Sequence, residues 1–230
     1  MRPVIPGDAR MEIKFVAREV HRPRLVNWLA MHPAGFKSPY PDRKVNNVYF
    51  DTHGYYAHAQ NLSGASARVK LRYRWYGESC EPAAGVLEVK CKRNYFGWKL
   101  RFKCPDVEMG PQDDWRQFQR SLSADIPLDG RIWLNTYPFP VMINRYFRQY
   151  FVSADEKVRV TIDTGQAVWD QRLKARPNYT LAANLPKSMV VEVKFDRHDR
   201  DLASSIIQGI PIRVSRHSKY ITGMNAINGR

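Results

Sequence analysis

The segment Ala67-Arg68-Val69-Lys70-Leu71-Arg72-Tyr73-Arg74-Trp75 places a cation at every second position. Alternate side chains of a β-strand point to opposite faces of its sheet, so the segment predicts a strand with one cationic and one apolar face. Successive cations on that face are only about 7 Å apart. Four like charges at this spacing repel one another, and we expect an anionic ligand to offset that repulsion.

The same alternation of charged and apolar residues recurs in five further segments, at residues 10–15, 87–92, 98–103, 157–163 and 191–196. An antiparallel sheet with one solvated face also alternates. Such a face would accept Thr, Ser and Gln equally well, whereas the polar positions here are almost purely charged. The composition therefore favours a ligand-binding face over an ordinary wet one.

Eight segments are candidate strands: residues 10–16, 45–51, 66–76, 85–93, 97–104, 142–152, 157–164 and 188–196. Turn-forming links indicate antiparallel hairpins. Eight strands can close into a barrel that holds side chains or one slender ligand. Helical patterns cover Pro23–His32, Gln112–Leu122, Leu202–Gln208 and Ser218–Ile227. The sequence predicts an α+β fold: an eight-stranded antiparallel β-barrel with a basic interior, covered outside by helices.

Composition agrees with an anion-binding protein. The 230 residues carry 37 Lys and Arg against 22 Asp and Glu, a net charge of +15, and suit a single domain over residues 1–230. The three cysteines lack metal-ligand spacing, and we expect a reducing, cytoplasmic setting. No apolar run reaches the length of a membrane span. No P-loop or dinucleotide-binding glycine motif occurs.

Three carboxylates share the charged strand faces: Glu12, Glu88 and Glu192. They would weaken binding of a bare polyanion. A divalent cation explains them, because Mg²⁺ takes one or two carboxylates and completes its shell with phosphate oxygens and water. The alternative is that each Glu neutralises a neighbouring Lys. We expect Mn²⁺ or Mg²⁺ as the cofactor.

Short motifs in these strands resemble the VTC polyphosphate polymerase domain of the triphosphate tunnel metalloenzyme (CYTH-like) superfamily. They run in family order from residue 10 to residue 220: Glu12-Ile13-Lys14, Arg68 to Gly77, Leu87-Glu88-Val89-Lys90, Tyr146-Phe147-Arg148, Arg159 to Asp163, Val191-Glu192-Val193-Lys194 and Ser218-Lys219-Tyr220.

The resemblance implies a polyphosphate polymerase that transfers the γ-phosphoryl group of ATP, or another nucleoside triphosphate, to a growing inorganic polyphosphate chain. It implies these phosphate ligands: Lys14, Arg72, Arg74, Lys90, Arg148, Arg159 and Lys219. Further tunnel-lining cations would be Arg68, Lys70, Lys99 and Lys194. Glu192 would bind the metal, helped by Glu12 and Glu88. Arg145 and Arg148 lie on opposite faces of one strand, and the Tyr-x-Arg motif selects Arg148.

The sequence departs from the superfamily's Glu-x-Glu-x-Lys signature, because Arg10 replaces the first carboxylate. Arginine there favours polymerase over the hydrolase and cyclase branches. The sequence also lacks the membrane segments of the eukaryotic vacuolar complex, which favours a bacterial, stand-alone form. The sequence does not indicate whether a membrane subunit is a partner.

Three other functions remain open at this point. A triphosphatase or tripolyphosphatase of the same architecture would use water in place of the chain end. A non-catalytic polyphosphate-binding module would not need Glu192. A nucleic-acid-binding groove would need aromatic rings beside the cations. Because Tyr73 and Trp75 lie opposite the cations on their strand, we expect no nucleic-acid partner.

Overall fold

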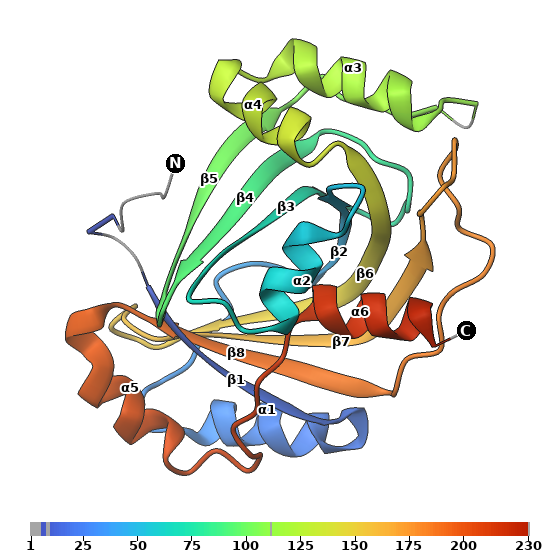
Figure 1. The fold of residues 1–230 in the computed structure, drawn as a ribbon. Helices are drawn as coiled ribbons and strands as arrows, with labels where there is room; N and C mark the ends of the chain where they lie inside the picture. The colour runs from blue at the N-terminus through green and yellow to red at the C-terminus, as the bar shows by residue number, and fades with distance from the viewer. Residues whose placement is uncertain (1–5, 8–9, 111, 230) are drawn as a thin grey trace.

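The fold is built on one sheet of eight antiparallel strands (Figure 1). The structure is a computed structural model that describes residues 6–7, 10–110 and 112–229, so the first five residues of the expected domain lie outside the described part. The strands, in chain order, are β1 (Met11–Arg18), β2 (Arg43–Asp51), β3 (Ala67–Tyr76), β4 (Gly85–Arg93), β5 (Phe96–Cys104), β6 (Phe139–Val152), β7 (Arg159–Asp170) and β8 (Ser188–Phe195).

The sheet curls until its two edges approach each other. The strand order is β1-β8-β7-β6-β2-β3-β4-β5. At the edges, the Arg10 N–H donates to the Gly97 carbonyl (3.2 Å) and the Gly97 N–H donates to the Arg10 carbonyl (3.4 Å). The predicted α+β class and the eight antiparallel strands are confirmed, and the strongly curved sheet has a concave and a convex face.

Six α-helices accompany the sheet in the described residues: α1 (Arg22–Met31), α2 (Tyr56–Leu62), α3 (Trp115–Asp125), α4 (Leu128–Thr136), α5 (Arg200–Ile207) and α6 (Lys219–Asn228). Short 3-10 turns precede α1 and α5, at Glu19–His21 and Arg197–Asp199. In the described part of the chain, no helix is both long and apolar enough to cross a bilayer.

Two of these helices were not predicted from the sequence. Helix α2 has only seven residues, and the Asp51 carboxylate accepts the N–H groups of Ala57 and His58 at its start. Helix α4 contains Gly130, a poor helix former. A Cβ at that glycine would lie 3.2 Å from Phe102 and Ile126, so close packing selects glycine there. Tertiary contacts fix both helices, and local periodicity does not reveal them.

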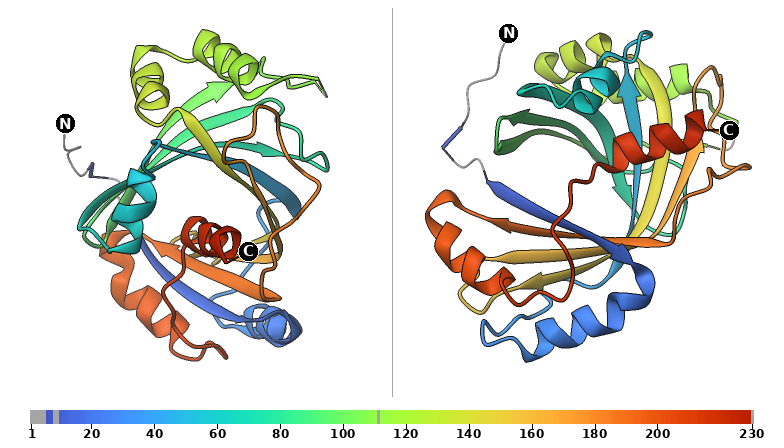
Figure 2. Two further views of the ribbon diagram at one scale, coloured as in Figure 1. Left: turned by 45° about the vertical axis from the view of Figure 1, so that its right-hand side comes forward. Right: turned by 60° about the horizontal axis from the view of Figure 1, so that its bottom comes forward.

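The convex face is covered by helices, as predicted. Helices α3 and α4 lie over β3–β5, and α1 and α5 lie over β1 and β8 (Figure 2). Leu71, Val89 and Val193, which alternate with the charged residues, are fully buried there. Two apolar clusters form the core, one including Tyr73, Trp75 and Phe118 and the other including Phe15, Leu25 and Val191.

Helix α6 departs from the expectation that helices lie outside, because it packs against the concave face. Tyr220 at its start stacks on Tyr49 of β2 with ring centroids 5.0 Å apart, and its hydroxyl donates to Asp51 (2.6 Å). A Cβ at Gly223 would lie 2.3 Å from the Met142 sulfur of β6, so any larger residue would force the Met142 side chain to move. Helix α6 therefore narrows the space enclosed by the sheet.

Candidate functional site

The charged side chains of the alternating strands converge in a pocket on the concave face. Residues from β1–β6 and β8 and from the start of α6 line it: Glu12, Lys14, Tyr49, Lys70, Arg72, Arg74, Lys90, Lys99, Tyr146, Arg148, Glu192, Lys194, His217, Ser218, Lys219 and Tyr220. We call it the basic pocket. Nine of these residues are Lys or Arg, and two are Glu.

Three lysines form a row across β3, β4 and β5 of the basic pocket. Lys70 is the direct cross-strand partner of Lys90, which is in turn the partner of Lys99. Like charges directly opposite each other destabilise a sheet. The Glu12 carboxylate raises the pKa of Lys90, but burial and the ammonium groups of Lys14 and Lys194 outweigh it, and the pKa falls to about 8. Burial and neighbouring cations also hold the pKa of Lys70 well below its usual value.

Glu192 is the central carboxylate of the basic pocket. Lys14 and Lys194 donate to its two oxygens, at 2.8 and 2.6 Å, and Arg148 and Lys219 lie at 3.7 and 3.9 Å. Burial acts to raise the pKa of Glu192, but these four cations hold it well below its usual range. Glu192 is therefore ionised at neutral pH.

Glu12 shares the lysine partners of Glu192. Its carboxylate lies 3.0 Å from Lys14 Nζ and 3.7 Å from Lys194 Nζ. The two carboxylates are thus held together by common cations. Within the described residues, no three His, Cys, Asp or Glu side chains gather to hold a metal ion. Two adjacent carboxylates fit a divalent cation that brings phosphate oxygens as its other ligands, since Mg²⁺ is usually bound in this way.

Glu88 lies apart from this pair. Arg72 Nε donates to one of its oxygens (2.8 Å) and Lys99 to the other (3.1 Å), with Arg74 at 3.9 Å. Its carboxylate is buried below the cations of β3 and β5 and is not among the lining groups. In this structure Glu88 is a counterion of Arg72 and Lys99, and its place beside a metal ion stays a prediction.

Asp163 is a site residue that the sequence prediction missed. It is fully buried and accepts hydrogen bonds from Arg148 Nε (2.6 Å) and Arg148 Nη2 (2.7 Å), and it lies 2.5 Å from Lys219 Nζ. The pair of bonds to one guanidinium fixes its plane. Asp163 therefore sets the positions of two cations that come from β6 and α6.

Eleven of the fourteen predicted site residues line the basic pocket, and three do not. Besides Glu88, Arg159 is solvent-exposed near one end of β7, although its Cα pairs with that of Lys194. Arg68 donates to the Ala65 carbonyl at the start of β3. The alternation of a strand predicts which face a residue lies on but not its position along the barrel axis. The two arginines therefore lie on the predicted face but outside the basic pocket.

Five lining residues were not predicted. Tyr146 and Ser218 belong to the motifs that select Arg148 and Lys219, so the motifs could have identified both as lining residues. Tyr220 belongs to the same motif as Ser218, and it meets Tyr49 only through the placement of α6. His217 carries no sequence signal; burial and the nearby Lys219 and Lys14 lower its pKa to about 4, so it is neutral at pH 7.

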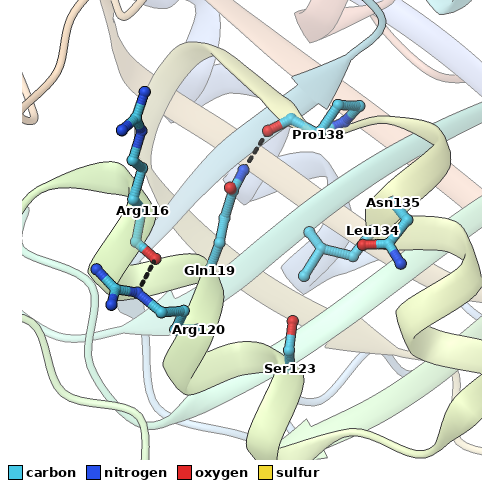
Figure 3. A pocket seen from close by; sticks show the side chains of 7 residues that line it. All are labelled: Arg116, Gln119, Arg120, Ser123, Leu134, Asn135 and Pro138. Atoms are coloured by element: carbon cyan, nitrogen blue, oxygen red, sulfur yellow. Dashed lines mark hydrogen bonds between the residues drawn. The ribbon is translucent and has the colours of Figure 1, made fainter.

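A second cavity lies on the convex side, between α3 and α4 (Figure 3). It holds about 500 Å³, against about 70 Å³ of free space in the basic pocket, where ion-paired side chains fill most of the volume. Its lining contains two exposed arginines, Arg116 and Arg120, and no carboxylate. By volume alone, this cavity would be chosen as the functional site. The basic pocket has the converging charges, buried ion pairs and shifted pKa values that mark functional sites.

The model of the VTC domain family matches residues 9–228, nearly the whole chain. The chain belongs to the VTC domain family. The resemblance inferred from the motifs is thereby confirmed. No curated protein matches the sequence.

Two solved structures share the fold. A putative adenylate cyclase from Vibrio parahaemolyticus has a TM-score of 0.53 at 10% identity, covering 97% of this chain and 99% of its own. A putative adenylyl cyclase from Hippeastrum, described as having a dominant triphosphatase activity, has a TM-score of 0.52 at 14% identity and covers 95% of both chains. At these identities the likeness supports the fold.

The lowered pKa of Lys90 predicts a pH-dependent affinity for polyanions. A bound polyanion favours the ammonium form. Below about pH 8 Lys90 is already protonated, whereas above it binding must take up a proton. Deprotonation of Lys90 should therefore lower the affinity for inorganic tripolyphosphate by up to about tenfold per pH unit above pH 8. Calorimetric titration at a series of pH values measures this, and Lys90→Met should show a shallower fall. Level affinity up to pH 9.5 would contradict the prediction.

Asp163→Asn tests whether this carboxylate holds Arg148 and Lys219. Removing one partner of a buried ion pair typically costs about 3–5 kcal/mol of folding stability. The variant should therefore melt at a lower temperature than the wild type. Because phosphate can replace the lost counterion, saturating tripolyphosphate should raise the melting temperature of the variant more than that of the wild type. An equal or smaller rise would mean that the two cations do not face the ligand.

Proposed function

We propose that the chain is a polyphosphate polymerase, which transfers the γ-phosphoryl group of ATP, or another nucleoside triphosphate, to the end of a growing inorganic polyphosphate chain. The observation that carries this proposal is the excess of nine cations over two carboxylates in the basic pocket. Lys70, Lys90 and Lys99 are half-buried and repel one another, and the nearby Glu12 and Glu88 offset only part of that repulsion, so a ligand with several negative charges in line would stabilise the row. A phosphate chain has that form.

The proposed phosphate ligands are the pocket cations Lys14, Arg72, Arg74, Lys90, Arg148 and Lys219, with Lys70, Lys99 and Lys194 beside them. Arg159 and Arg68 would act at the ends of the path. Arginines suit phosphate oxygens because their planar donors bind two at once. Glu88 and Asp163 would keep Arg72 and Arg148 in place while the ligand changes.

Phosphoryl transfer depends mostly on positioning and on stabilising the charge that develops between the two oxygens. The terminal phosphate of the chain is already anionic near neutral pH, so it can attack without a protein base. The pocket cations would hold the donor and acceptor phosphates in line. They would also neutralise the negative charge on the nucleoside diphosphate that leaves. Bound Mn²⁺ or Mg²⁺, held by Glu192 with Glu12, would supply further neutralisation of phosphate charge.

A triphosphatase is the second candidate, because a structurally similar protein is described as having that activity. Hydrolysis would replace the chain end with water, which needs activation. The first carboxylate of the usual signature is absent: Arg10 stands there and pairs with the exposed Asp196 at 3.2 Å. The position thus offers no base, which supports the polymerase. The free thiols of Cys80, Cys91 and Cys104 agree with the proposed reducing cytoplasm.

Incubation with ATP and Mn²⁺ tests the proposal. We expect long polyphosphate chains on a stained gel, with release of ADP. Glu192→Gln should abolish chain synthesis, because the metal loses its main carboxylate. The same variant should bind tripolyphosphate in chelator at least as tightly as the wild type, since a charge that repels phosphate is gone.

Glu78→Gln is the matched control, because Glu78 is exposed and pairs with Lys44 outside the basic pocket. It should leave synthesis unchanged. Release of orthophosphate without chains would favour the triphosphatase. Normal synthesis by a folded Glu192→Gln variant would show that Glu192 is not a metal ligand. Loss of folding in that variant would show that Glu192 acts as the structural partner of a lysine.

A further inference from the structure

A group of three tyrosines surrounds one arginine where β2 begins and β3 ends. The Arg43 guanidinium carbon lies 4.1 Å from the ring centroid of Tyr76, 5.1 Å from that of Tyr150 and 5.9 Å from that of Tyr40. Arg43 Nε also donates to the Tyr150 hydroxyl (3.1 Å). We call these four residues the tyrosine rim.

The tyrosine rim adjoins the basic pocket on the same face of the sheet. Arg43 is the direct cross-strand partner of Arg148, and paired residues point to the same side. Tyr76 follows Arg72 and Arg74 at two-residue spacing on β3, so it shares their face. Arg148 in turn lies 6.0 Å from the Tyr150 ring centroid. A ligand held by Arg148 can therefore extend directly to the rim.

The rim is chemically unlike the rest of the concave face. Arg43 has no carboxylate partner within ion-pair distance among the described residues, whereas Arg72 and Arg148 are each fixed by a buried acid. Tyr40 and Tyr76 remain 57% and 43% exposed. A guanidinium held between aromatic rings provides a flat, partly apolar surface with free donors at its edge. Such a surface fits a planar heteroaromatic ring, by stacking and by cation–π attraction.

We propose that the tyrosine rim binds the heteroaromatic base of the nucleoside triphosphate whose phosphates lie in the basic pocket. This rests on the proposed use of a nucleoside triphosphate as donor. The rim adds no base-specific pocket of buried donors, so it favours nucleotides over inorganic phosphate chains without selecting one base. The other use of this surface, as a path for a phosphate chain along Arg43, is an outcome that the experiment distinguishes.

The experiment compares ATP with inorganic tripolyphosphate, which lacks the base and ribose. Calorimetric affinities are measured in chelator for the wild type and for the double variant Tyr40→Leu/Tyr76→Leu, which keeps apolar bulk at two exposed positions. The variant should lose about tenfold in ATP affinity and less than twofold in tripolyphosphate affinity. Tyr56→Leu is the matched control, because Tyr56 is equally exposed but lies on α2, and both of its affinities should equal those of the wild type.

Each other result overturns the proposal in a different way. An equal loss for both ligands would show that the rim contacts phosphate, and no loss for either would show that it contacts no part of the ligand. Both results leave the proposed function standing, because the wild type still binds phosphate chains. Failure of the wild type to bind either ligand would overturn the proposed function as well. A thermal melt of the double variant confirms that it is folded.

Discussion

Repulsion among the cations of the concave face is the constraint on which the rest of the structure depends. Isolated charges are costly to bury, and each lysine or arginine in the pocket needs either a counterion or water. Three fully or nearly buried carboxylates, Glu88, Asp163 and Glu192, supply part of the balance. Each contacts at least two cations from different strands or from α6. Apolar strand residues such as Leu71, Val89 and Val193 are then buried on the convex face, because the charged groups occupy much of the concave face.

This balance has a direct consequence for ligand binding. The carboxylates and cations fill the pocket, which leaves about 70 Å³ free. A phosphate chain would enter by taking hydrogen bonds of the pocket cations from these carboxylates, and its added negative charge would offset the excess of cations. Lys14 and Lys194, which now contact Glu192 and Glu12, can turn to phosphate, while Arg72 and Arg148 stay fixed by acids behind them.

The sequence predicts the face of each strand residue because the period of a β-strand is two. Lys70, Arg72 and Arg74 therefore lie together, and Leu71 and Val89 lie under helices, as expected. The same rule fails for position along the barrel axis, which depends on strand stagger. Arg159 has the right face but lies at an exposed end.

Other features could not be predicted because they arise from tertiary contacts. Asp163 was seen in the alternation, but only the meeting of β6 and α6 shows that it binds two site cations. The inward packing of α6 rests on the fit of Gly223 to Met142, which no local pattern contains. The tyrosine rim depends on the loop that brings Tyr40 to Tyr150, with ring centroids 5.6 Å apart.

A crystal structure of the protein with tripolyphosphate and Mn²⁺ tests the central claim most directly. The account predicts phosphates on the concave face, in contact with Arg72, Arg148 and Lys219, and a metal ion between the phosphates and Glu192. Phosphates bound only at Arg116 and Arg120, in the cavity between α3 and α4, with the Lys14–Glu192 and Arg148–Asp163 pairs unchanged, would contradict it.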